Sequence, residues 1–110
     1  MARLSLVTLV VSDYDEAIAF YTGSLGFLLP EDTILAPDKR WVVVAPASGG
    51  TGLLLAKAKN EAELAAIGNQ TGGRVFLFIE TDNFDRDHAA MLSKRVPFRE
   101  LPRREVYGTV

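Results

Sequence analysis

The chain of 110 residues contains no cysteine, one histidine and one tryptophan. The absence of cysteine excludes disulfides, thiolate nucleophiles and cysteine metal sites. No apolar run is long enough to span a bilayer, and the amino terminus lacks the organisation of a signal peptide, so we expect a cytoplasmic protein. Acidic and basic residues are interspersed, and the formal net charge is only −2. This balance argues against nucleic acid or a membrane surface as the main partner.

The sequence does contain a repeat. Residues 6–21 and residues 74–91 each combine an apolar strand, a short acidic turn and an amphipathic helix. A duplicated strand–helix unit predicts two similar modules packed around one shared sheet. The repeat makes Leu6 and Arg74 equivalent positions, each on the first strand of its module.

Apolar periodicity and turn residues define the other elements. Helices are expected at about 13–25, 61–67 and 82–95, the first two with capping boxes at Asp13/Glu16 and Asn60/Glu63. Strands are expected at about 4–11, 27–30 (ended by Pro30), 40–45, 53–56, 74–80, 98–101 and 107–110, and the loop at 31–39 could contain a brief strand at 33–35. The order is βαβββ, a linker helix, then βαββ, which indicates an α+β fold. We predict a single domain with a first module at about 1–57, a linker helix at 60–68 and a second module at 73–110 that lacks its last strand.

The alternation of side chains along the module strands separates the core from a candidate site. An aliphatic set should pack beneath the helices: Val7, Leu9, Val11, Val75, Leu77 and Ile79. A mixed set should line the opposite face: Thr8, Arg74, Phe76 and Phe78. This set predicts the wall of a ligand pocket with apolar surface and one fixed cation. Alternatively, the two phenylalanines could equally fill space against another strand or subunit.

Arg74 is the first candidate for ligand binding, because a guanidinium can hold a carboxylate or phosphate bidentately. A structural salt bridge, for example to Glu80, is the alternative. Trp41 could stack on a planar ligand or belong to the core or a dimer interface. Tyr107 could donate a hydrogen bond to a ligand. His88 is predicted to be a packed or half-buried helix residue, not a metal ligand.

The segment from Leu9 to Phe27, LVVSDYDEAIAFYTGSLGF, resembles the signature VxDxxxAxxFYxxxLGF of the vicinal oxygen chelate superfamily. That superfamily includes glyoxalase I, bleomycin-resistance proteins and extradiol dioxygenases, and the resemblance covers essentially the whole chain. It implies two βαβββ modules whose strands curl into an open, cup-shaped mixed sheet. In metal-dependent members a histidine on the first strand of each module and a carboxylate on the last hold a divalent metal, which acts as a Lewis acid.

This chain departs from that pattern at the ligand positions. The first-strand positions hold Leu6 and Arg74, neither of which can ligate a metal, and the strand at 53–56 has no acid. The resemblance and the departure together favour a metal-free protein of the bleomycin-resistance kind, without a cofactor, that binds a small planar or anionic molecule in the cup. The alternatives are a metal-dependent lyase, isomerase or dioxygenase of the same superfamily with an altered metal site, and a structural or regulatory domain. A homodimer is expected, since an open cup exposes much apolar surface.

Overall fold

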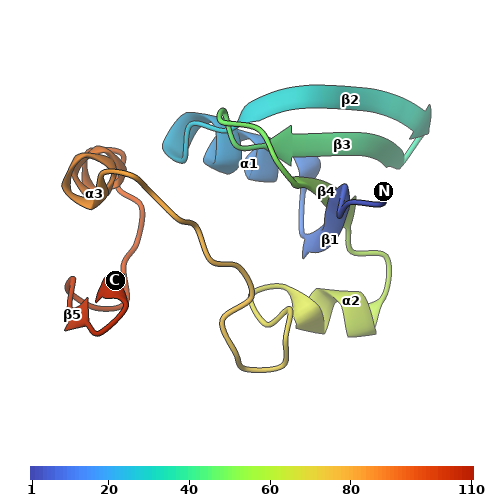
Figure 1. The fold of residues 1–110 in the computed structure, drawn as a ribbon. Helices are drawn as coiled ribbons and strands as arrows, with labels where there is room; N and C mark the ends of the chain where they lie inside the picture. The colour runs from blue at the N-terminus through green and yellow to red at the C-terminus, as the bar shows by residue number, and fades with distance from the viewer. The chain divides into compact units, whose positions relative to one another are not determined.

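Four strands form a mixed sheet in the first part of the chain (Figure 1). The computed structural model describes all residues from 1 to 110, in two compact units, Met1–Leu77 and Phe78–Val110. The strand order is β1-β4-β3-β2, with β1 parallel to β4 and the other pairs antiparallel. The strands are β1 (Leu6–Val11), β2 (Leu28–Ala36), β3 (Lys39–Ala45) and β4 (Gly52–Lys57). This open mixed sheet confirms the predicted α+β class.

Local capping signals place the helices of this unit. Helix α1 (Tyr14–Ile18) begins after Asp13, whose carboxylate accepts a hydrogen bond from the Glu16 backbone N–H at 2.8 Å. It continues as the π-helix η1 (Ala19–Ser24), and Gly26 then turns the chain with a φ of 74°, as expected for a residue just past a helix end. Helix α2 (Glu61–Ala66) is capped in the same way by Asn60. The predicted N-caps Asp13 and Asn60 are confirmed, but the return bond that completes a capping box is not formed: Glu63 Oε1 accepts from the Lys59 N–H and not from the Asn60 N–H. None of the helices combines the length and the apolar character that a membrane span requires.

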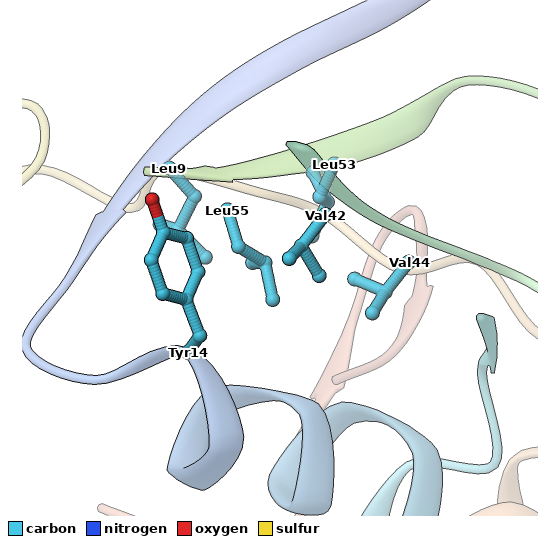
Figure 2. Close-up of a cluster of buried hydrophobic side chains, with 6 residues drawn as sticks. All are labelled: Leu9, Tyr14, Val42, Val44, Leu53 and Leu55. Carbon is cyan, nitrogen blue, oxygen red and sulfur yellow. The ribbon is translucent and has the colours of Figure 1, made fainter. Parts of the chain in front are cut away.

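The core lies between α1 and one face of the sheet (Figure 2). The cluster consists of Leu9, Tyr14, Val42, Val44, Leu53 and Leu55. Val7 and Val11 pack against it, as the alternation along β1 predicted. Because Leu9 pairs with Leu55 and Leu55 pairs with Val42, one row of directly opposed residues supplies half of this cluster.

One strand takes the place of the strand predicted at 27–30 and of the brief strand that the loop after it could contain. Strand β2 runs through Pro30 without ending, and its register against β3 shifts between Leu28 and Glu31. Proline is tolerated here because β2 is an edge strand and the shift removes the requirement for a ladder hydrogen bond from Pro30. Glu31 therefore belongs to a strand and not to a loop.

The second unit contains one helix and a small hairpin. Helix α3 (Phe84–Ser93) begins after Asn83, slightly later than the predicted start at about residue 82, because the Asn83 side chain accepts the hydrogen bond from Arg86 N–H. At its other end Arg95 adopts a φ of 60°, and its N–H donates to the Leu92 carbonyl. This is the closing turn of a Schellman motif, completed by the N–H of Val96. The hairpin pairs β5 (Arg104–Glu105) with β6 (Gly108–Thr109).

Two predicted strands are wrong, because residues 74–80 and 98–101 form no strand. The strand predicted at 107–110 exists as the shorter β6, and Tyr107 lies in the turn before it. A strand exists only where a neighbouring strand supplies its hydrogen bonds, and none pairs with residues 74–80 or 98–101. The expected alternation fails with the strand, since Val75 is exposed while Phe76 packs against the core cluster.

Candidate functional site

The sheet has a second face, opposite α1, which we call the open face. Directly paired residues of neighbouring strands point to the same side of a sheet. Thr8 pairs with Leu54, Leu54 with Val43, and Val43 with Glu31. The adjacent row brings in Trp41 and its partner Thr33. The open face is therefore defined by Thr8, Glu31, Thr33, Trp41, Val43 and Leu54. It joins two of the predicted ligand-binding residues, Thr8 and Trp41, on one surface.

Trp41 is fixed on this face by a hydrogen bond. Its indole Nε1–H donates to Glu31 Oε2 at 3.1 Å, from β3 to the neighbouring β2. The ring is half-buried, and Glu31 and Thr33 beside it are exposed. The arrangement holds a flat aromatic surface next to a carboxylate. Glu31 was not among the predicted site residues, because Pro30 was expected to end the strand before it.

Leu6, at the first of the two implied metal-ligand positions, lies at the margin of the open face. It packs over Gly52 towards Val43: a Cβ placed on Gly52 would lie 3.0 Å from Val43 Cγ1 and 3.2 Å from Leu6 Cδ2. The absence of a side chain at Gly52 thus lets the two aliphatic side chains approach each other. This position is part of an apolar surface.

Arg74, the second such position, is exposed. Its N–H donates to the Thr71 hydroxyl at 2.8 Å, and that hydroxyl donates to the Arg74 carbonyl at 2.6 Å. These bonds fix the backbone of the turn, and no ion pair within Met1–Leu77 involves the guanidinium. Phe76, further along the same segment, packs against the core.

Two predicted site residues belong to the second unit. Phe78 is 88% exposed and Tyr107 is 74% exposed. In the same unit His88 is half-buried between two rings, stacked on Phe84 at a centroid distance of 5.5 Å and edge-on to Phe98 at 4.8 Å. The prediction that His88 is a packed helix residue is confirmed.

A cluster of charged side chains that was not predicted from the sequence lies on the helix side of the sheet. Arg40 Nε and Nη2 bind the two carboxylate oxygens of Asp32 at 3.1 and 2.7 Å, and Nη1 binds Asp15 at 2.9 Å. The hydrogen bond from Arg40 holds the pKa of the Asp32 carboxyl below its usual value, and the same bonds raise the pKa of Arg40. The guanidinium also lies 5.2 Å from the Tyr14 ring centroid. This cluster joins α1 to β2 and β3.

The side chains present do not fit the divalent metal that the resemblance implies. Leucine has no donor atom and arginine stays protonated, and strand β4 carries no acid. No group of three or more histidine, aspartate or glutamate side chains in the structure could hold a metal ion.

Comparisons with known proteins agree on one family. The family model described as the glyoxalase/bleomycin resistance protein/dioxygenase superfamily matches residues 3–110. An uncharacterised protein of Shewanella frigidimarina (strain NCIMB 400) is 53% identical over 106 residues, which cover 94% of this chain and 78% of that protein. The crystal structure of UcmS2 is 28% identical with a TM-score of 0.83, covering 99% of this chain and 86% of that one. TnmS3, an antibiotic binding protein from Streptomyces sp. CB03234, is 28% identical with a TM-score of 0.66, covering 86% of this chain and 71% of that one.

Proposed function

Since the chain belongs to the glyoxalase/bleomycin resistance protein/dioxygenase superfamily, we propose that it binds a small planar or anionic molecule without a metal ion. The observation that carries the proposal is Trp41, a ring held by Glu31 on the open face of the sheet. An aromatic side chain of this kind offers a large rigid contact area to a flat ligand at little entropic cost. TnmS3, a structural relative, is an antibiotic binding protein, which supports the choice of a small molecule as partner.

The ligand-binding residues in this proposal are Trp41, Thr8 and Arg74 in the first unit, with Phe78 and Tyr107 as separate candidates in the second. Phe76 was predicted with them, but it packs against the core cluster. Thr8 offers a hydroxyl on the same surface as the indole. Arg74 is exposed and without an ion pair within its unit, so its guanidinium is available for an anionic group. Phe78 and Tyr107, exposed aromatic residues of the second unit, stay predictions of ligand-binding residues within that unit.

The metal-dependent alternative has less support. A lyase, isomerase or dioxygenase of this superfamily would need donor atoms where this chain has Leu6 and Arg74. A cytoplasmic location and a homodimer complete the proposal. Superfamily members often form dimers, and sedimentation that shows only the 12.0 kDa monomer at high concentration would contradict this part.

Calorimetric titration with acridone, a planar neutral compound, tests the site. We expect Trp41→Ala to weaken binding about tenfold or more, because stacking on an indole contributes roughly 1–3 kcal/mol per ring. Ile34→Ala is the matched control. Ile34 is an exposed apolar residue of the same sheet, and its partner Arg40 places it on the helix side. Equal losses in both variants, or no loss in Trp41→Ala, would refute the site assignment.

A further inference from the structure

The charges around Trp41 differ on the two sides of β2. Glu31 and Asp32 are neighbours in sequence, so their side chains point to opposite faces of the strand. On the helix side, Arg40 neutralises Asp32 through two hydrogen bonds, one to each carboxylate oxygen. Glu31, on the open face, forms no ion pair in the structure. The open face therefore keeps an uncompensated carboxylate beside its aromatic ring.

The geometry ties that carboxylate to the ring. Only Oε2 of Glu31 accepts the indole N–H, which leaves Oε1 without a partner. The hydrogen bond that the indole N–H donates to the anionic carboxylate increases the electron density of the indole ring. The face of the ring then attracts a cation more strongly. The remaining residues of the open face are apolar or hydroxyl-bearing and carry no charge: Thr8, Thr33, Val43 and Leu54. Lys39 lies two residues before Trp41 on the same side of β3, at the end of the strand next to the β2–β3 turn.

We infer that the Trp41–Glu31 pair selects a planar cation bearing an N–H donor, such as a protonated aromatic amine or amidine, over a planar anion. The ring of the ligand would lie on the indole, and its N–H group would donate to the free oxygen of Glu31. The inference rests on the proposed function, and it chooses between the two ligand classes that the proposal left open at Trp41. An anionic group of the ligand, if present, would have to be held elsewhere.

Three acridines of nearly equal shape test the inference by calorimetric titration at low ionic strength: 9-aminoacridine, which is cationic at neutral pH, neutral acridone, and anionic acridine-9-carboxylate. We expect the wild-type chain to bind the cation about tenfold more tightly than the anion, a difference of about 1.4 kcal/mol, because the Glu31 carboxylate attracts the cation and repels the anion. Glu31→Gln keeps an acceptor for the indole N–H but removes the charge. It should abolish the preference for the cation over the anion.

Glu61→Gln is the matched control, because it makes the same charge change on the exposed first turn of α2 in the same unit. It should keep the tenfold preference, which separates a local effect of Glu31 from the general negative charge of the chain. The inference would be overturned if the wild-type chain bound the anion as tightly as the cation or more tightly, or if the preference survived in Glu31→Gln. In either case, acridone binding that is lost in Trp41→Ala would still support the proposed function. Failure of all three compounds to bind would overturn both.

Discussion

At the scale of single residues, Gly52 shows how the fold sets the shape of the open face. The glycine lies in β4 with ordinary strand geometry, so what matters is the space it leaves and not its backbone freedom. Leu6 and Val43 fill that space from the two sides. The position that the resemblance equates with a metal ligand is here closed by aliphatic packing.

Gly52→Val should therefore destabilise the chain by roughly 1–3 kcal/mol, the usual cost of overpacking. The new Cβ would meet Val43 and Leu6 at 3.0–3.2 Å before any further methyl group is added. Urea unfolding followed by circular dichroism measures the change. Gly23→Val is the control for losing a glycine, because nothing lies within 4 Å of a Cβ at Gly23. Equal stability of Gly52→Val and wild type would show that the two side chains are free to move apart.

At the scale of elements, Arg40 connects α1 with the β2–β3 pair. The backbone N–H of Arg40 donates to the buried Tyr14 hydroxyl at 3.2 Å, and its guanidinium binds Asp15 and Asp32. The Arg40 side chain thus connects α1, β3 and the edge strand β2 on the side of the sheet that α1 covers. Because Trp41 follows Arg40 directly, the same joint fixes the strand that carries the indole.

The Arg40 joint predicts a pH dependence of stability. The pKa of Asp32 is lower in the folded chain than its ordinary value, so the folded state binds fewer protons than the unfolded state as the pH falls. Its contribution is present above about pH 4, near the pKa of an unperturbed aspartate, and is lost as the pH drops through the folded-state value. Asp32→Asn should lower the melting temperature at pH 7, and the difference from wild type should shrink towards pH 2.

Asp38→Asn is the matched control for that titration. Asp38 lies in the exposed turn between β2 and β3 and takes part in no ion pair, so its variant should follow the wild-type curve at every pH. A difference between Asp32→Asn and wild type that stays constant from pH 7 to pH 2 would contradict the role given to the Asp32 carboxylate.

The free edge of β1 is protected by a side chain instead of a strand. Gln70 Nε2 donates to the Val10 carbonyl at 2.8 Å, and the Val10 N–H donates to Gln70 Oε1 at 3.3 Å. The carboxamide thus occupies a donor and an acceptor that another strand could otherwise use, and unprotected edges invite pairing between chains.

Gln70→Ala should cost about 1 kcal/mol of stability, as expected for the loss of hydrogen bonds to neutral groups, and it should speed hydrogen exchange at the Val10 amide. Exchange measured by NMR at single residues reports this directly. Asn69→Ala, at the neighbouring position whose side chain makes no hydrogen bond of its own, should leave Val10 protected. Unchanged protection of Val10 in Gln70→Ala would mean that another group shields this edge.

At the scale of the whole molecule, the predictions from sequence succeeded where the signal is local. The caps at Asp13 and Asn60 bond to residues only three positions away, so composition and spacing suffice to place them. Apolar periodicity and turn residues predicted the βαβββ order of the first unit, and the resemblance in residues 9–27 predicted the superfamily; both are confirmed.

The predictions failed where a distant partner decides. Residues 74–80 have the alternation of a strand, but pairing depends on another segment and none is paired with them. Without that strand, the alternation of side chains does not determine the direction of Phe76, which packs against the core cluster. Glu31 and Arg40 were missed for a related reason, because their bonds cross between strands, and no spacing within one segment encodes them.

The central claim, a planar molecule bound by Trp41 without a metal, is tested most directly by one calorimetric titration. Protein treated with a chelator is titrated with acridone, and the titration is repeated after addition of Mn²⁺, Ni²⁺ or Zn²⁺. We predict binding of equal affinity with and without metal, lost in Trp41→Ala. Binding that appears only after metal is added would contradict the claim and would favour the metal-dependent alternative.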